Sequence, residues 1–312
     1  MKNNEKMTST GVVCLLALIC CGLWGSAFPF IKIGYSEYKI APDDTPSQIL
    51  FAGIRFTIAG LMVIVFTSLM KRKISIPKNF NQVRQIGIVS LFQTILQYFF
   101  YYIGLANTPA VRSAIIIGTN VFTAVIISAL LFKLEKLTLN KIFGCAVGFV
   151  GILIMNLSGA GIGQIPTLKG DGMVFLSTIA YAFSSVVMKK FSSETDPIML
   201  SGWQFLFGGV VMSILGKISG GELPFLTFSN SGVLVYLAFI SAGAYSLWSI
   251  LLKYNPVSRV AVYGFMNPVF GVILSALMVN GERDALGIQS VISLFLVCMG
   301  IYMVNKSSKS IG

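Results

Sequence analysis

Histidine is absent from this chain of 312 residues, and acidic side chains are scarce, with 11 Asp and Glu against 23 Lys and Arg. The lack of histidine removes the most common metal ligand and the usual general base of enzymes. Charged residues are only 11% of the chain and hydrophobic residues are 55%, whereas a soluble domain carries roughly 25% charged residues. So few charges do not cover a water-exposed surface, and the composition therefore indicates an integral membrane protein.

The net charge of +12 does not indicate a nucleic-acid partner. Lys and Arg stand almost wholly in short gaps between apolar runs, as topology signals do, whereas a nucleic-acid-binding protein gathers them on one face. The five cysteines all fall in apolar segments and lack the spacing of a metal site. We therefore expect no nucleic acid, no metal and no cofactor, and we interpret the cysteines as small packing residues.

Ten apolar windows are long enough to cross a membrane, because a span needs about 20 mainly apolar residues. The first window follows two lysines and has some likeness to a signal sequence, but it is too long for one. The sequence predicts an all-α integral membrane protein with ten transmembrane helices. The windows are 11–34, 47–70, 84–106, 110–132, 139–157, 170–190, 197–217, 231–252, 257–280 and 285–304.

The orientation follows from the basic residues between the windows. If the N-terminus is cytoplasmic, the segments on the cytoplasmic side hold most of the Lys and Arg. Cytoplasmic loops carry such an excess in membrane proteins. We therefore expect a multi-pass protein of the cell membrane with both termini in the cytoplasm.

The chain also contains an internal repeat. A constant shift pairs Arg112 with Arg259 and Asn120 with Asn267, and pairs Ser128-Ala129-Leu130 with Ser275-Ala276-Leu277 and Glu135 with Glu282. A slightly longer shift pairs Gly53, Phe56 and Gly60 with Gly202, Phe205 and Gly209, and pairs Gly151 and Asn156 with Gly300 and Asn305.

The repeat divides the chain into two halves, 1–157 and 170–312, joined by a glycine-rich linker at 158–169. Each half holds five predicted helices. Because five is odd, equivalent helices run in opposite directions across the membrane. We therefore predict two inverted five-helix repeats, a plan common in secondary transporters.

Several short motifs carry a family resemblance. The run from Trp24 to Lys32 (WGSAFPFIK), the pair Arg55-Phe56, Ala59-Gly60, and the run from Asn267 (NPVFGVILSAL) with the later Gly281-Glu282 resemble the EamA-type permeases of the drug/metabolite transporter superfamily. The resemblance covers nearly the whole chain. One departure is Val121, where the family usually has proline, so the two halves are expected to bend differently there.

This resemblance implies ten helices with both termini inside. It also implies a central cavity lined mainly by helices 1, 3, 4, 6, 8 and 9. Members of the family move amino acids and other small metabolites, often outward. The motifs are short and apolar, so they point to the family and not to the substrate.

Polar and aromatic residues inside the spans are candidates for the solute path, because polar groups that face lipid are costly. Gln93, Gln97 and Tyr101 recur at every fourth position and would share one helical face. The alternative is that such groups bond helix to helix or bond their own backbone, which we favour for Ser and Thr. The candidate substrate-binding residues are Trp24, Ser26, Gln93, Gln97, Tyr101, Asn120, Thr123, Tyr181, Ser185, Tyr245, Trp248, Tyr263 and Asn267.

Two of these candidates have repeat mates on the facing helix. The shift pairs Gln97 with Ala244 and Tyr101 with Trp248. We therefore expect Tyr101 and Trp248 to face each other, with an apolar part of the solute between the two rings.

Arg55 is the one basic residue inside a predicted span. Counted from Ser47, it lies about 12 Å into the helix at 1.5 Å per residue. A guanidinium can reach much of that distance back to the surface, toward Asp43 or Asp44. We favour this structural role, and an anion site is the alternative. The repeat mate of Arg55 is Gln204, so no symmetric site is implied.

No Asp or Glu lies in the middle of a predicted span. A proton-coupled exporter of cationic drugs usually needs an embedded carboxylate. We therefore predict a transporter, by alternating access, of a small neutral or zwitterionic metabolite such as an amino acid. The alternatives are a proton-coupled drug exporter and, less favoured because no catalytic motif lies at membrane depth, an intramembrane enzyme.

Three further expectations concern packing and partners. Glu135 and Glu282 stand at helix ends, where capping or loop pairing is expected. Gly144 and Gly148 form a small-residue face that lets a neighbouring backbone approach. We expect it to pack against another helix, and the family resemblance implies the tenth helix as the preferred partner. The expected partners are a small-molecule solute and the lipid bilayer, with the chain as a monomer or a weak homodimer.

Overall fold

The structure is a computed structural model that describes residues 6–108, 110–156, 166–224, 228–278 and 288–309. These residues form helices joined by short loops and contain no strand. Residues 158–165 of the predicted linker, 158–169, lie outside the described residues, as do Gly281 and Glu282. The elements in chain order are α2 (Thr10–Glu37), α3 (Thr45–Lys71), α4 (Phe80–Ser90), η1 (Leu91–Leu96), α5 (Gln97–Leu105), α6 (Ala110–Gly118), α7 (Asn120–Ile126), η2 (Ile127–Leu131), α8 (Leu139–Asn156), η3 (Leu168–Gly172), α9 (Met173–Phe191), α10 (Pro197–Ile218), α11 (Phe228–Tyr254), α12 (Val257–Ala261), η4 (Val262–Phe265), α13 (Met266–Met278) and α14 (Ile288–Lys309).

Seven helical stretches of the described chain are long and apolar enough to cross a membrane. Several combine adjoining elements, such as Phe80–Leu105, which joins α4, η1 and α5. Two shorter apolar helices, Leu139–Ile154 and Val291–Lys306, lie within α8 and α14. The chain is therefore an all-helical, multi-pass membrane protein.

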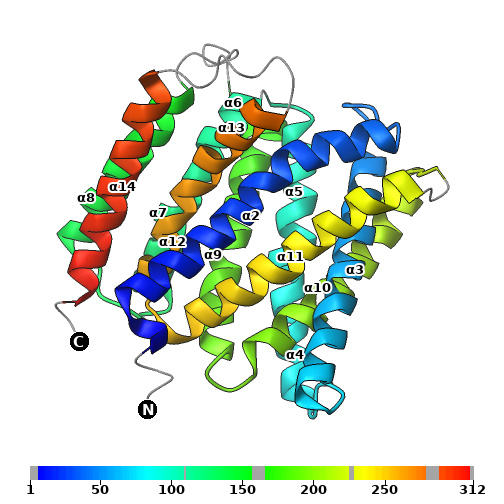
Figure 1. Cartoon of the computed structure of the whole chain (residues 1–312), viewed down its shortest axis with the longest axis horizontal. Coiled ribbons are helices and arrows are strands. Elements are labelled where there is room, and N and C mark those ends of the chain that lie inside the picture. The colour runs from blue at the N-terminus through cyan, green and yellow to red at the C-terminus, as the bar shows by residue number, and fades with distance from the viewer. Residues whose placement is uncertain (1–5, 109, 157–165, 225–227, 279–287, 310–312) are drawn as a thin grey trace.

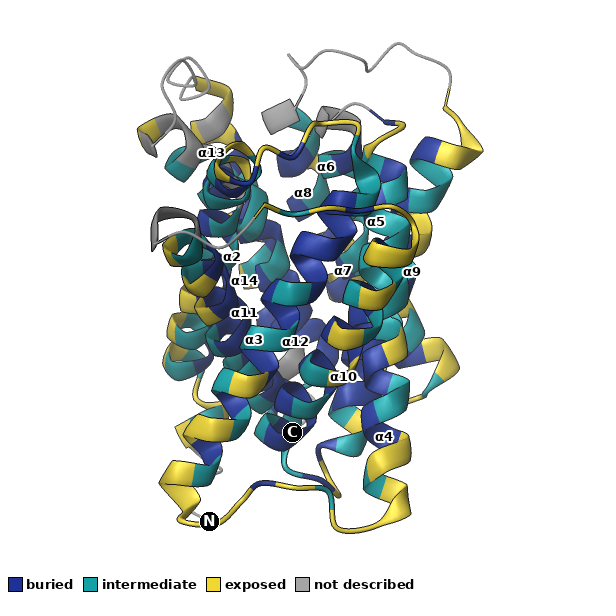
Figure 2. Ribbon diagram, turned by 90° about the vertical axis from the view of Figure 1, so that its right-hand side faces the viewer, coloured by how far each residue is buried: buried dark blue, intermediate teal, exposed yellow. Residues whose placement is uncertain are grey.

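The helices form one bundle in which α2 begins and α14 ends at the same end (Figure 1). The pair α8 and α14 lies at one side of the bundle, and the pair α3 and α10 lies at the other. Between them, α2 packs against α11 and α13, while α5 and α7 pack against α9. Buried residues follow the inner faces of these helices and exposed residues follow their outer faces and the loops (Figure 2).

Glycines allow α3 and α10 to approach closely. A Cβ on Gly60 would lie 2.8 Å from the carbonyl oxygen of Gly202, and a Cβ on Gly209 would lie 2.8 Å from that of Gly53. The contacts move backward along α10 as they move forward along α3, so the two helices are antiparallel. Backbone contact of this kind excludes any larger side chain at these positions.

The small face of the fifth window packs against the tenth window, as predicted. A Cβ on Gly144 would lie 2.9 Å from the carbonyl oxygen of Gly300, and one on Gly300 would lie 2.5 Å from that of Gly144. A Cβ on Gly148 would lie 2.5 Å from the ring of Phe265, so this ring fills the space beside the glycine. This interface of α8 with α14 and η4 confirms the packing role of the two glycines.

The fourth predicted span breaks at Thr119, between α6 and α7. The Thr119 backbone N–H donates to the carbonyl oxygen of Ile116 at 2.9 Å, and its hydroxyl donates to the same oxygen at 2.6 Å. This turn comes just before Val121. In the second half the equivalent bend is the four-residue 3-10 helix η4, which precedes Pro268. The two halves therefore bend by different means, as predicted from the missing proline.

Candidate functional site

Aromatic rings from five elements meet in the interior of the bundle. The Trp24 ring lies 5.0 Å from the Tyr245 ring and 5.0 Å from the Trp248 ring, both edge-on. The Tyr245 ring also lies 4.9 Å from the Phe205 ring. We use the name aromatic cluster for Trp24, Phe56, Tyr98, Tyr101, Tyr102, Phe205, Tyr245 and Trp248. Rings at these separations attract one another beyond the gain from burial.

Repeat mates touch each other at the centre of this cluster. The Tyr98 and Tyr245 hydroxyls are 3.0 Å apart and 147 positions apart in sequence, the same shift that pairs Asn120 with Asn267. The Phe56 and Phe205 rings, which are mates by the longer shift, stack at 5.2 Å with planes 9° apart. Equivalent residues of the two halves therefore meet in the middle of the protein.

Arg55 lies against the aromatic cluster and does not reach the membrane surface. It is 4% exposed, and its guanidinium carbon is 4.4 Å from the centre of the Phe56 ring and 6.0 Å from that of Tyr98. The expected extension toward Asp43 or Asp44 is wrong. Asp44 instead accepts the backbone N–H of Ser47 at 3.0 Å and caps α3. The side chain turns inward because the ring faces attract a cation there.

Several polar atoms of the predicted site residues are buried and have no hydrogen-bond partner among the described residues. They come from different elements, α2, η1, α5 and α13, and they are Trp24 Nε1, Gln93 Oε1, Gln97 Oε1 and Asn267 Oδ1. Buried polar atoms in proteins are nearly always paired with protein or water. These four candidates are therefore suited to bind something other than the protein itself.

The helix that carries Gln93 and Gln97 is not a regular α-helix. Gln93 lies within the π-helix η1 and Gln97 begins α5 directly after it, so the wider π-turn breaks the expected stripe between Gln93 and Gln97. The α-helical spacing holds only from Gln97 to Tyr101, both in α5. Single π-turns inside helices occur frequently at functional sites.

The hydroxyl groups among the candidates bond mainly within the chain. The Thr123 hydroxyl donates to the carbonyl oxygen of Thr119 at 3.0 Å, and the Ser185 hydroxyl donates to that of Tyr181 at 3.0 Å. Ser26 donates to Leu23 at 2.8 Å and lies 3.1 Å from the Tyr236 hydroxyl. These bonds match the structural role that the sequence favoured for Ser and Thr.

The remaining candidates are placed as follows. Tyr263 is 2% exposed, and its carbonyl oxygen accepts the Cys21 thiol at 3.2 Å. Asn120 is half-buried beside Gly264 of η4, with Asn120 Oδ1 4.0 Å from where a Cβ on Gly264 would stand. Tyr101 and Trp248 do not pair with each other directly, and the solute expected between them stays a prediction. Trp248 pairs with Trp24, whereas the Tyr101 ring pairs with Tyr98 and Tyr102.

The end of the bundle that holds both termini is closed by a hydrogen-bonded network around Glu135. Its carboxylate lies 2.5 Å from Lys141 Nζ, and the two side chains are 6% and 3% exposed. It also accepts the hydroxyl of Ser128 at 2.7 Å and the backbone N–H of Ser258 at 3.0 Å. Burial raises the pKa of the Glu135 carboxyl, but the hydrogen bonds from Lys141, Ser258 and Ser128 outweigh it and hold the pKa below the ordinary value.

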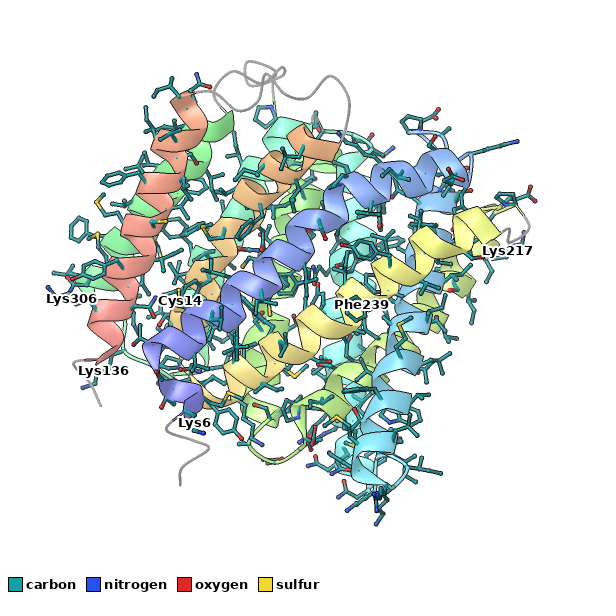
Figure 3. The ribbon with its side chains drawn as sticks, in the orientation of Figure 1. Lys6, Cys14, Lys136, Lys217, Phe239 and Lys306 are labelled. Atoms are coloured by element: carbon teal, nitrogen blue, oxygen red, sulfur yellow. The ribbon has the colours of Figure 1, made fainter. Side chains whose placement is uncertain are left out.

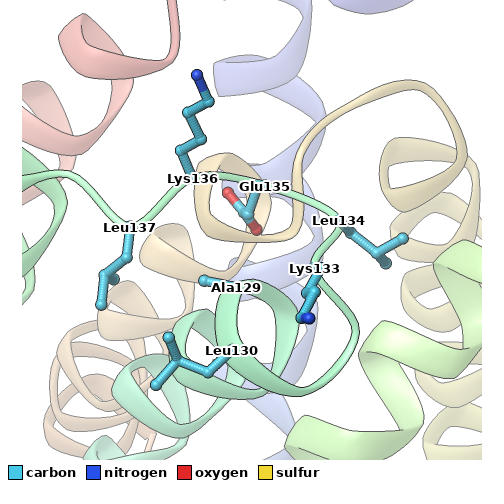
Figure 4. A pocket seen from close by; sticks show the side chains of 7 residues that line it. All are labelled: Ala129, Leu130, Lys133, Leu134, Glu135, Lys136 and Leu137. Carbon is cyan, nitrogen blue, oxygen red and sulfur yellow. The ribbon is translucent and has the colours of Figure 1, made fainter.

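Glu135 also lines a surface hollow of about 680 Å³ at this end (Figure 4). The other lining residues come from η2 and the loop that follows it, from Ala129 to Leu137. None of the predicted site residues lines this hollow. It lies apart from the aromatic cluster, and the pairing expected for Glu135 at a helix end is confirmed.

Two features of the central site were missed in the sequence. Tyr98 was not a candidate, and the repeat pair Phe56 and Phe205 was noted only as a sign of duplication. Applying the shift to every polar residue of the third window would have found Tyr98, because its mate Tyr245 was already a candidate. Nothing in the sequence indicated that Arg55 turns inward.

The fold and this site define a class: a multi-pass helical membrane protein with unpaired polar groups in its interior. The EamA-like transporter family matches the chain twice, over residues 11–157 and 168–306. The chain belongs to this family, and the resemblance found in the sequence is confirmed.

Individual relatives agree with this assignment. An uncharacterized transporter of Bacillus subtilis, YvbV, is 27% identical over 98% of this chain and 95% of its own. The uncharacterized inner membrane transporter YedA of Escherichia coli is 27% identical over 90% of this chain and 89% of its own. A solved crystal structure matches the fold with a TM-score of 0.76 at 19% identity, over 97% of this chain and 99% of that one.

Proposed function

We propose that the chain carries a small neutral or zwitterionic metabolite, such as an amino acid, across the cell membrane by alternating access between two inverted five-helix repeats. The observation that supports this proposal is that Trp24, Gln93, Gln97 and Asn267 hold buried polar atoms without a described partner, with Trp24 in the aromatic cluster itself. An unpaired buried polar group costs roughly 1–3 kcal/mol. A solute that bonds these groups would remove that cost.

The reciprocal glycine contacts support the inverted repeat. By the longer shift, Gly60 corresponds to Gly209 and Gly53 corresponds to Gly202. The contact of Gly60 with the Gly202 carbonyl therefore maps onto the contact of Gly209 with the Gly53 carbonyl, and both distances are 2.8 Å. A reciprocal contact of this kind is the property of a two-fold axis.

The pair α8 and α14 gives the same result independently. The longer shift maps the contact of Gly151 with the Ser293 carbonyl, at 2.9 Å, onto that of Gly300 with the Gly144 carbonyl, at 2.5 Å. With α12, η4 and α13 counted as the ninth span, this supports ten helices about one axis in the membrane plane. The touching mates Tyr98 and Tyr245 would lie on that axis, where the two repeats rock against each other.

We place both termini in the cytoplasm. Lys6, Lys136 and Lys306 lie at the end where the chain begins and ends, whereas Lys217 lies at the other end (Figure 3). The excess of basic residues at the first end supports a cytoplasmic location. In a variant without native cysteines, Ser219→Cys should react with an impermeant thiol reagent added outside, and Ser193→Cys should not. Both serines are exposed, so the reverse pattern would invert the orientation.

Counterflow tests the transport proposal. Proteoliposomes that hold the purified chain are loaded with one unlabelled amino acid, and uptake of its labelled form is followed for a panel of neutral amino acids. A transporter accumulates label transiently by exchange, and an enzyme or a structural protein does not. Absence of exchange for the whole panel would reject the amino-acid class. Since the site lies within one chain, reconstitution as monomers should suffice.

A further inference from the structure

Building on the proposed transport function, we propose that Arg55 binds the carboxylate of the transported solute inside the aromatic cluster. The solute class is then narrower than a neutral metabolite: a zwitterion or monoanion with one carboxylate and an apolar part.

The argument begins with the bonds that Arg55 lacks. Arg55 is 4% exposed and makes no hydrogen bond and no ion pair with any described residue. Among the described residues, its guanidinium instead lies over the rings of Phe56 and Tyr98. A buried guanidinium without an anion or acceptor is strongly unfavourable. A residue in this position therefore calls for a negatively charged partner that enters from outside the protein.

The nitrogens of Arg55 are not equivalent. Nε is sealed from solvent without a partner, whereas the two terminal nitrogens, which also bond no described residue, are not sealed. The terminal edge of the guanidinium is therefore the part that a ligand can reach. The Tyr98 ring lies 6.0 Å from the guanidinium carbon, the Tyr101 ring lies 6.5 Å from the Tyr98 ring, and the Tyr245 hydroxyl lies 3.0 Å from that of Tyr98. Tyrosine hydroxyls can donate to an anion alongside the guanidinium.

The charge balance favours a carboxylate over a phosphate. The other buried basic side chains, Lys141 and Arg259, belong to the network at the end with both termini. Arg55 is thus the single cation of the aromatic cluster among the described residues. One guanidinium neutralises one carboxylate and matches its two oxygens in a planar fork, whereas a phosphate would keep excess charge in a dry site.

The rest of the site fits the other parts of an amino acid. The unpaired acceptors Gln93 Oε1, Gln97 Oε1 and Asn267 Oδ1 suit an ammonium group. The ring faces of Trp24 and Tyr245 suit an apolar side chain. The repeat mate of Arg55 is Gln204, whose Oε1 accepts the Thr94 hydroxyl at 2.6 Å and whose Nε2 bonds no described residue. The two halves thus offer one charged and one neutral position, which orients the solute.

The test compares acids with their amides. The melting temperature of purified wild-type protein in detergent is measured with L-alanine, L-leucine or L-phenylalanine, with the amide of each, and with 3-phenylpropionate. Each value is compared with the melting temperature in sodium chloride at the same concentration. The acids, including 3-phenylpropionate, should raise the melting temperature, and the amides should not. Arg55→Gln should bind the effective acids about thirtyfold more weakly or worse, because one partner of a buried charged pair is lost. Arg55→Lys should retain part of the acid preference.

Three outcomes would overturn the proposal: equal shifts from acids and amides or from chloride, no shift from any acid, or an Arg55→Gln variant that responds as the wild type does. A control variant, Arg259→Gln, should keep the preference for acids, since Arg259 bonds only protein groups. Counterflow separates this proposal from the transport function. Acid binding without exchange would reject transport and keep the Arg55 site. Equal exchange by wild type and Arg55→Gln would reject the Arg55 site and keep transport.

Discussion

Two arginines are buried among the residues whose side chains the structure describes, and they differ in their hydrogen bonding. Arg259, 7% exposed, donates to Asn255 at 3.1 Å, to Asn305 at 3.3 Å and to Thr10 at 3.0 Å. Arg55, 4% exposed, donates to no described residue. Both belong to a membrane protein in which an unpaired charge is costly. The difference separates a region built to hold helices together from a region built to receive a solute.

The same contrast extends to the neighbours of each arginine. Around Arg259, the Asn255 side chain also reaches the carbonyl oxygen of Met7 at 3.0 Å, and Lys189 donates to that of Asn255 at 2.7 Å. This end of the bundle is therefore tied across both halves. Around Arg55, the rings of Phe56 and Tyr98 lie against the guanidinium, and no described residue accepts a hydrogen bond from its Nε.

The largest effect is expected at the closed end. Glu135→Gln should lower the free energy of unfolding by about 3–5 kcal/mol, because it leaves Lys141 buried without its counterion. Thermal melting measures this, and Glu222→Gln is the matched control. Glu222 pairs with Lys217 at 3.8 Å on the surface, so its loss should matter little. If Glu135→Gln and Glu222→Gln had the same melting temperature, the buried pair of Glu135 and Lys141 would not stabilise this end of the bundle.

The difference in stability between wild type and Glu135→Gln should also depend on pH. The folded-state pKa of Glu135 is lowered, so the carboxylate stabilises the fold above the ordinary pKa of 4.5 and loses this effect as the pH falls through the lowered value. The gap between wild type and Glu135→Gln should be constant near neutral pH and should shrink only below 4.5. A gap that closes near pH 7 would point to another group.

A smaller effect is expected at the α8–α14 interface. Gly148→Ala places a Cβ 2.5 Å from the Phe265 ring, and overpacking of this kind costs about 1–3 kcal/mol. Gly87→Ala is the matched control, because nothing lies within 4 Å of its Cβ position, and alanine there should stabilise the helix slightly. If both variants melted alike, the close packing of Gly148 would be wrong.

The smallest stability effect, with a large functional one, is expected at Gln97. Its Oε1 bonds no described residue, so Gln97→Ala should leave the melting temperature almost unchanged. Counterflow per folded molecule should fall about tenfold, the equivalent of one lost hydrogen bond to a charged group. The exposed amide variant Asn140→Ala controls for amide loss. Normal transport with lowered stability would instead make Gln97 a link between helices.

These regions were not equally predictable from the sequence. Hydropathy located the seven stretches that are long enough to cross a membrane, and the Gly144–Gly148 spacing predicted a close helix contact, because both depend on local sequence pattern. The partner of that contact, α14, came from the family resemblance. The inward turn of Arg55 could not be predicted from local pattern, since it depends in part on the Tyr98 ring of α5, a separate helix. The π-turn at η1 was missed for a similar reason: Leu91–Leu96 reads as an ordinary apolar helix, and Ser90 and Thr94 bond across to Gln204 of α10.

The most direct test of the contrast compares the melting temperatures of Arg55→Gln and Arg259→Gln without added solute. Arg259→Gln should melt well below wild type, because it strips the bonds to Asn255, Asn305 and Thr10. Arg55→Gln should melt at the wild-type temperature or above it, because it removes an uncompensated charge. If Arg55→Gln melted as low as Arg259→Gln, Arg55 would be a structural residue and the central site would lose its basis.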